Sequence, residues 1–262
     1  MINIYTRKIN TLFGWTVFMA VLLVSCNKNN SESIIIATAA NAQFAVEEIV
    51  EKFENETGIN VEIVSSSSGK HTAQIEAGAP YDVFISADMK YPEQLYKLGL
   101  TENKPKVYAY GKLVLWTLND IPAESIKDLP LIKATHIAIP NPKTAPYGRA
   151  AMEALQYYQL FDTLKNQLVY GESIAQANQF ILSKSVDIGF SAASVAMAPK
   201  MKGKGKWFIV DTSSYSPIEQ GAVILSNSSN INSAMKFYDY LFSDVSKDIL
   251  IRHGYEVTDN NL

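Results

Sequence analysis

Short apolar runs alternate with helix-like segments along most of this 262-residue chain. Residues 34–37, 61–64 and 81–86 each have the length and composition of a buried strand. Apolar side chains recur at helical spacing through residues 44–54, and Gly58 follows as a helix-ending residue. Because successive parallel strands are usually joined by a helix, this alternation predicts an α/β fold, with mainly parallel sheets flanked by helices.

The same alternation continues to the C-terminus and predicts two lobes. Further strands are expected at residues 112–116, 136–139, 167–170, 186–190, 207–210 and 221–225, and further helices at residues 68–77, 91–98, 148–158, 174–182, 234–242 and 247–253. About 230 residues of this kind fit two cores better than one open sheet. We expect one lobe from residues 34–110 with a return in about 213–262, and the other from residues 111–212. A cleft between two such lobes is a common site for a small ligand.

The N-terminus has the plan of a secretory signal. Two basic residues precede an apolar stretch at residues 12–24, which is short for a spanning helix, and Leu-Val-Ser-Cys follows at residues 23–26. This ending resembles the bacterial lipobox, so we expect residues 1–26 to be a lipoprotein signal peptide and Cys26 to carry the lipid. Residues 27–33 are polar and are expected to form a flexible tether. The expected location is the periplasm or cell envelope, anchored to the membrane; a plain signal peptide and a short membrane anchor are the alternatives.

Charge and cysteine content exclude several classes of function. The net charge is −3, and the only pronounced basic run, residues 200–206, is broken by glycines. Nucleic acid is therefore not an expected partner, because phosphate binding needs clustered Lys and Arg. The run is interpreted as a solvated loop, or alternatively as a docking surface for a membrane partner. A single cysteine excludes an internal disulfide framework and a Cys-rich zinc site.

Four strand-to-helix junctions share a chemistry suited to anions. Asn41 begins the first helix, Ser68 begins the second after three further serines, and residues 145–148 and 171–174 precede two later helices. In an open α/β sheet such junctions lie at the carboxyl ends of the strands, where ligands bind. The first N–H groups of a helix lack intrahelical partners, and the helix dipole is positive there. Taken singly, Asn41 and Ser173 are better interpreted as ordinary helix caps, Gly148 is also consistent with a turn glycine, and Ser68 fits either role.

Two such helix starts from each lobe would hold a dianion without Lys or Arg. Neutral donors avoid the desolvation penalty of a buried ion pair, and each hydrogen bond to a charged group contributes about 1.5–3 kcal/mol. A cage made only of donors leaves the hydrogen of a protonated oxyanion unpaired. The predicted guest is therefore a fully deprotonated tetrahedral dianion rather than hydrogen phosphate, and cage size would separate a larger oxyanion from sulfate.

Several of these segments together resemble the ModA-type molybdate-binding proteins of ABC importers. The resemblance is carried by residues 69–70, 74–80 (Gln-Ile-Glu-Ala-Gly-Ala-Pro), 82–88, 146–149 and 171–173. It extends from residue 34 to about residue 255, and the block from 74 to 88 is its most specific part. The resemblance implies a type II periplasmic-binding-protein fold of two α/β lobes, with molybdate or tungstate held in the cleft at the hinge.

By position, the resemblance implies that Asn41, Ser68, Tyr147 and Ile174 bind the oxyanion. Ser68 would donate through its hydroxyl and its N–H, and Tyr147 and Ile174 through their backbone N–H groups. Asn41 stands where many members have a serine, and its side-chain amide can still donate. Ala192 falls where some members place a tyrosine hydroxyl on the ligand, so the cage has one donor fewer or another group replaces it.

The resemblance therefore implies an extracytoplasmic substrate-binding component rather than an enzyme. The expected partners are the small oxyanion, a membrane permease with its ATPase, and the membrane through the lipid anchor. The protein is expected to be a monomer without a cofactor. The choice between molybdate and tungstate stays open.

Other functions remain as alternatives. One is the binding of another oxyanion such as sulfate. Another is an exported serine hydrolase using Ser68 with His71, although the G-x-S-x-G elbow is missing. A third is an envelope interaction lipoprotein with no small ligand. Glu76, Asp82 and Asp88 are interpreted as capping or surface carboxylates, with a metal cluster as the alternative.

Overall fold

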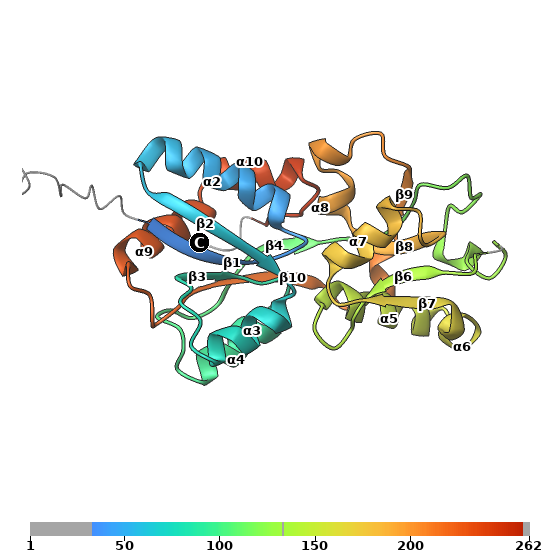
Figure 1. The fold of residues 1–262 in the computed structure, drawn as a ribbon, viewed down its shortest axis with the longest axis horizontal. Coiled ribbons are helices and arrows are strands. Elements are labelled where there is room, and N and C mark those ends of the chain that lie inside the picture. The colour runs from blue at the N-terminus through green and yellow to red at the C-terminus, as the bar shows by residue number, and fades with distance from the viewer. Residues whose placement is uncertain (1–32, 133, 259–262) are drawn as a thin grey trace, which may run out of the picture. The chain divides into compact units, whose positions relative to one another are not determined.

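Two five-stranded sheets flanked by helices make up the computed structural model, which describes residues 33–132 and 134–258 (Figure 1). The first sheet has the order β2 (Asn60–Ser66), β1 (Ser33–Ala39), β3 (Val83–Ile85), β10 (Ile218–Ile224), β4 (Lys106–Gly111). The second has the order β7 (Leu168–Gly171), β6 (Ile137–Pro140), β8 (Ile188–Ala192), β5 (Leu113–Thr117), β9 (Lys206–Ile209). The expected signal peptide and Cys26 lie outside the described residues, as does the expected tether except for Ser33, which begins β1.

Helices accompany each sheet. The first sheet has α2 (Gln43–Thr57), α3 (Ser68–Glu76), α4 (Lys90–Lys97), α9 (Ile231–Leu241) and α10 (Asp244–Arg252). The second has α5 (Pro146–Tyr157), α6 (Phe161–Leu164), α7 (Ile174–Leu182) and α8 (Ala193–Ala196). Figure 1 shows α2 and α10 on one face of the first sheet and α3 and α4 on the other. Within the described part of the chain, no helix combines the length and apolar character needed to cross a membrane.

In each sheet four strands point the same way and one is reversed. β1 pairs in parallel with β2 and β3, while β10 is antiparallel to β3 and β4. β6 pairs in parallel with β7 and β8, while β5 is antiparallel to β8 and β9. The reversed strand is in both sheets the first one formed after the chain crosses from the other lobe. This confirms the two-lobed α/β fold with mainly parallel sheets; the lobe boundaries given above stay predictions.

The two crossings between the lobes run side by side. Lys112 alone separates β4 from β5, and residues 210–217 separate β9 from β10. Gly111 pairs with Ile218 across the β4–β10 ladder, and the Leu113 N–H donates to the Tyr215 hydroxyl at 3.1 Å. The crossings therefore form a tied pair that positions the strand ends of both lobes.

Each lobe has a hydrophobic core. The apolar sides of α2, α9 and α10 bury one face of the first sheet. In the second lobe, α5 and α7 pack against the second sheet. The core of the second lobe also includes Ala39, Ala40 and Ala87, which lie at or just beyond strand ends of the first. The lobes thus share apolar contacts as well as two chain crossings, and the described residues form one compact unit.

The structure adds elements that the sequence pattern did not predict. β4 is an edge strand paired only with β10, so its alternation of buried and exposed residues is weak. α6 and α8 have four residues each, too few to show a helical period. α5 begins at Pro146 rather than residue 148, because proline suits the first position of a helix, where no N–H partner is needed.

Candidate anion-binding site

The start of α3 separates the roles of two adjacent serines. Ser67 is the N-cap, and its hydroxyl accepts a hydrogen bond from the Lys70 N–H at 3.4 Å. The Ser68 hydroxyl accepts from the Ala87 N–H at 2.9 Å and is only 1% exposed. Because that bond uses an oxygen lone pair, the hydroxyl hydrogen of Ser68 can be donated to an anion.

Asn41 lies just before α2 and is 1% exposed. Its Nδ2 donates to Gln220 Oε1 and to the Tyr255 hydroxyl, both at 2.8 Å. Both amide hydrogens therefore have protein acceptors, and the expected donation from the side chain to a ligand stays a prediction. The group that Asn41 can offer an anion is its backbone N–H.

In the second lobe, α5 and α7 begin at neighbouring strand ends. Pro140 pairs with Gly171 at the ends of β6 and β7, and the two helices follow. Tyr147 is the second residue of α5, and Ile174 is the first of α7. The start of α5 lies close against β6, since a Cβ on Gly148 would be 2.2 Å from the Pro140 carbonyl oxygen.

The four junctions present backbone donors at the ends of parallel strands. Over residues 33–132 and 134–258, the structure shows no protein acceptor for the backbone N–H groups of Asn41, Ser68, Tyr147 and Ile174. Ser68, Tyr147 and Ile174 lie in the first turn of helices of at least nine residues, where the helix dipole is positive. Asn41 lies two residues before the first residue of α2. Such groups are suited to bind an anion.

Hydrogen bonds join Asn41 and Ser68 within the first lobe. Gln220 accepts from Asn41 through Oε1, and its Nε2 donates to the Ala87 carbonyl at 3.0 Å. The Ala87 N–H in turn donates to Ser68. Asn41 and Ser68, the two predicted ligand residues of the first lobe, are therefore linked through the buried Gln220 side chain and the Ala87 peptide.

Further hydrogen bonds join the first-lobe part of the site to the second lobe. The Gly69 N–H donates to the Thr144 carbonyl at 3.0 Å, which connects the start of α3 to the segment before α5. The Thr144 hydroxyl donates to the Glu172 carbonyl at 3.2 Å, which reaches the segment before α7. The structure thus brings all four predicted junctions into one network of contacts.

Two cationic side chains beside these helix starts are paired with carboxylates. Lys70 lies 3.8 Å from Glu172, and Arg149 forms an ion pair with Asp88. Burial raises the pKa of the Tyr147 hydroxyl, so this side chain stays neutral. The donors available to an anion here are therefore hydroxyl and backbone N–H groups.

The pairing of Ser68 with a histidine base is not present. His71 Nε2 lies 3.0 Å from the Thr38 carbonyl oxygen, and Nδ1 lies 3.2 Å from the Gln74 side chain. Burial lowers the pKa of His71, which keeps the ring neutral. The imidazole therefore holds α3 against β1, and the Ser68 hydroxyl bonds to a peptide N–H instead of to a base.

The three carboxylates considered as a metal cluster have separate partners. Asp82 accepts from the Ile35 N–H at 2.7 Å, and Asp88 is paired with Arg149. Glu76 accepts from the Gln94 side chain at 2.6 Å. Among the described residues, no group of three His, Cys, Asp or Glu side chains could hold a metal ion.

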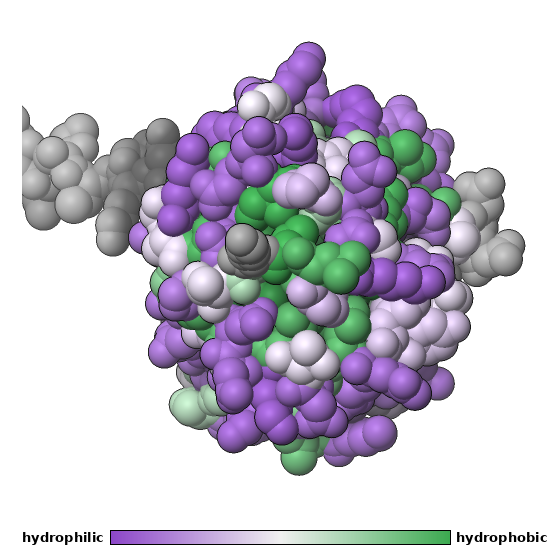
Figure 2. Space-filling model, turned by 90° about the vertical axis from the view of Figure 1, so that its right-hand side faces the viewer, coloured by the Kyte–Doolittle hydropathy of each residue, from purple (hydrophilic) through white to green (hydrophobic). Residues whose placement is uncertain are grey.

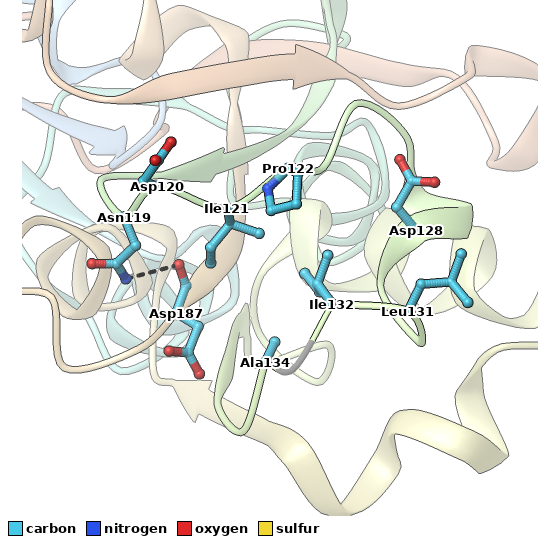
Figure 3. A pocket seen from close by; sticks show the side chains of 9 residues that line it. All are labelled: Asn119, Asp120, Ile121, Pro122, Asp128, Leu131, Ile132, Ala134 and Asp187. Carbon is cyan, nitrogen blue, oxygen red and sulfur yellow. Dashed lines mark hydrogen bonds between the residues drawn. The ribbon is translucent and has the colours of Figure 1, made fainter.

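A separate cavity of about 480 Å³ lies in the second lobe, at the edge opposite the helix starts (Figure 3). It is lined by Asn119, Asp120, Ile121, Pro122, Asp128, Leu131, Ile132, Ala134 and Asp187. Figure 2 faces this end of the lobe and shows hydrophobic residues gathered within a polar rim. Burial alone would raise the pKa of Asp187, but hydrogen bonds from His136 and Thr135 together lower this pKa below its ordinary value. Three lining aspartates make this cavity unsuited to an anion.

Sequence reasoning missed the side chains that surround Asn41. Gln220 and Tyr255 are 179 and 214 residues away along the chain, and the Ser194 hydroxyl donates to the Asn41 carbonyl at 2.9 Å. No local motif marks any of the three. The one available signal was a glutamine beside the apolar run at residues 221–225.

Comparisons with known proteins agree with this geometry. Residues 34–256 match the family described as bacterial extracellular solute-binding protein. The molybdate-binding protein ModA of Azotobacter vinelandii is 37% identical over 238 residues, covering 89% of this chain and 93% of that protein. A putative ABC transporter substrate-binding lipoprotein of Bacillus subtilis, YvgL, is 29% identical over 252 residues, covering 92% and 94%. The solved structure of the Azotobacter vinelandii periplasmic molybdate-binding protein matches with a TM-score of 0.82 at 33% identity, covering 86% of this chain and 100% of that one.

Proposed function

This chain belongs to the bacterial extracellular solute-binding protein family, and we propose that it is the molybdate- or tungstate-binding component of an ABC transporter. The observation that carries the proposal is the set of neutral donors at three helix starts and at Asn41, just before a fourth helix. Two come from each lobe, and the neighbouring Lys70 and Arg149 are paired with carboxylates. The similarity to the molybdate-binding protein of Azotobacter vinelandii supports the choice of guest.

The proposed oxyanion ligands are Ser68, through its hydroxyl and N–H, and the backbone N–H groups of Asn41, Tyr147 and Ile174. A tetrahedral dianion accepts at every oxygen and satisfies such donors without leaving a hydrogen unpaired. Because the donors come from both lobes, the anion binds the closed arrangement better than an open one, and binding shifts the population toward closure. No covalent step and no cofactor are involved.

We further propose an extracytoplasmic location, with Cys26 as the lipid-bearing anchor of a monomer. The loaded protein would then present its ligand to a membrane permease with its ATPase. The likeness to a putative substrate-binding lipoprotein supports this part of the proposal. The oxyanion is the cargo of the protein.

Calorimetry on the purified full-length chain in detergent tests the ligand. We expect one-to-one binding of molybdate and tungstate, with much weaker heats for sulfate and for hydrogen phosphate. Indistinguishable affinities for molybdate and hydrogen phosphate would contradict a donor-only cage. Tight sulfate binding with weak molybdate binding would show that the ligand is the smaller oxyanion, sulfate.

A further inference from the structure

Gln220 is a fully buried amide near the start of β10, with 0% exposure. Its Nε2 donates to the Ala87 carbonyl at 3.0 Å and to the Ile218 carbonyl at 3.1 Å. Carbonyl oxygens only accept, so these two bonds fix the orientation of the amide and turn Oε1 toward Asn41. A buried amide is costly unless it is hydrogen-bonded, and here both of its polar atoms have partners.

The orientation of Gln220 determines that of Asn41. Only Nδ2 of Asn41 can donate to Gln220 Oε1, at 2.8 Å, and its second hydrogen goes to the Tyr255 hydroxyl at 2.8 Å. The Tyr255 hydroxyl donates back to the Asn41 carbonyl at 3.2 Å. Asn41 is therefore held at both its side chain and its carbonyl group, and these bonds restrain the residue that carries the N–H.

The same glutamine also reaches Ser68. The Ala87 peptide lies between them, with its carbonyl accepting from Gln220 and its N–H donating to the Ser68 hydroxyl at 2.9 Å. Holding that peptide sets the direction in which the Ser68 hydroxyl presents its hydrogen. Gln220 thus bonds directly to Asn41 and, through the Ala87 peptide, supports Ser68, the other proposed ligand residue of the first lobe.

We propose that Gln220 and Tyr255 are positioning residues of the anion site, which preorganise the Asn41 N–H and the Ser68 hydroxyl without touching the ligand. This inference rests on the proposed function. Donors fixed in place before binding need no reorganisation when the anion arrives, and their spacing sets the size of the guest that fits. Since Gln220 is the third residue of β10, the strand formed after the return crossing, the hinge itself supports the site.

The test compares Gln220→Met with a matched buried control. Thr117→Val removes a hydroxyl that is 2% exposed and donates to the Asp187 carbonyl at 2.6 Å, at the opposite edge of the second lobe. Molybdate affinity is measured by calorimetry on the full-length chain, and thermal unfolding is recorded without ligand. We expect Gln220→Met to weaken molybdate binding by about 10- to 100-fold, by analogy with the loss of affinity when hydrogen-bond partners of metal-ligating residues are removed. Thr117→Val should lower the unfolding temperature and leave the affinity unchanged.

A double variant separates positioning from general destabilisation. Asn41→Ala keeps the backbone N–H but removes the amide through which Gln220 acts. In that background Gln220→Met should weaken binding by a smaller factor than in the wild type, because contacting residues of one network are not additive. Tyr255→Phe removes a single hydroxyl and is expected to weaken binding by a smaller factor than Gln220→Met; it decides the question if Gln220→Met does not fold.

The outcomes distinguish the inference from the function on which it rests. If the wild type does not bind molybdate, the proposed function fails. If the wild type binds and Gln220→Met or Tyr255→Phe binds equally well, the positioning role is overturned. The role is also overturned if Thr117→Val weakens binding as much as Gln220→Met does, or if the Asn41→Ala background leaves the effect of Gln220→Met undiminished.

Discussion

Two neighbouring hydroxyls at the start of α3 have different partners and should respond differently to removal. Ser68→Ala deletes a proposed donor to the anion and also leaves the buried Ala87 N–H without its acceptor. We expect molybdate binding to weaken by about 1–3 kcal/mol, measured by calorimetry. Ser67→Ala removes only the cap on the Lys70 N–H, so it should lower the free energy of unfolding by about 0.5–2 kcal/mol while the affinity stays nearly unchanged. Equal affinities for the two variants would remove the Ser68 hydroxyl from the proposed site.

The positions of the four junctions could be predicted from the sequence, but which atoms of each residue are free to bind a ligand could not. A serine after an apolar run marks a helix start, and such a start offers N–H groups whatever its side chains. Asn41 shows the limit. Whether its amide donates to a ligand depends on Gln220 and Tyr255, which reach it only through the fold. The sequence therefore predicts backbone donors better than side-chain donors.

The helix α3 is held against β1 by a histidine that stays neutral, and this makes the free energy of unfolding depend on pH. Burial lowers the pKa of His71 below its ordinary value of 6.5. Above that value the ring is neutral in both the folded and the unfolded chain. As the pH falls below 6.5, the unfolded chain takes up the proton first, so the free energy of unfolding decreases until the folded-state pKa is reached. The decrease is at most about 1.4 kcal/mol per pH unit for one proton.

The variant His71→Gln isolates this contribution, since its amide can still donate to the Thr38 carbonyl but does not titrate. Urea unfolding at about pH 7.5 and about pH 5.5 should show a larger loss of stability for the wild type than for the variant. Parallel losses in the two proteins would mean that His71 is protonated as readily in the folded chain as in the unfolded one.

Helices and strands with a clear hydrophobic periodicity were predicted well. Elements that form because of their pairing with distant strands were not. The strands β1 and β2 and the helices α2 and α7 follow directly from runs and spacings in the sequence. β4 depends on its pairing with β10, more than a hundred residues later, so the local sequence around β4 does not predict it. The same holds for the reversal of β5 and β10, because strand direction is decided by the crossing between lobes.

At the scale of the whole molecule, several polar contacts join the lobes beside the proposed site. Arg149 pairs with Asp88 and donates to the Tyr91 hydroxyl at 3.5 Å, and that hydroxyl donates to the Lys143 carbonyl at 3.1 Å. These contacts form only when the lobes are close together. A sequence can predict that two lobes exist, but it cannot predict which surface residues meet on closure, since that depends on the angle that the crossings allow.

The Arg149–Asp88 ion pair should therefore bias the protein toward closure even without ligand. The two side chains are 28% and 14% exposed, so solvent screening reduces the contribution of the pair to about 1 kcal/mol. We expect Arg149→Met to enlarge the radius of gyration of the ligand-free chain in small-angle X-ray scattering and to weaken molybdate binding about fivefold. Lys165→Met is the control, because it removes an exposed pair with Asp162 inside the second lobe and should change neither quantity. An Arg149→Met variant with unchanged scattering and unchanged affinity would show that the anion alone, and not the contacts between the lobes, determines closure.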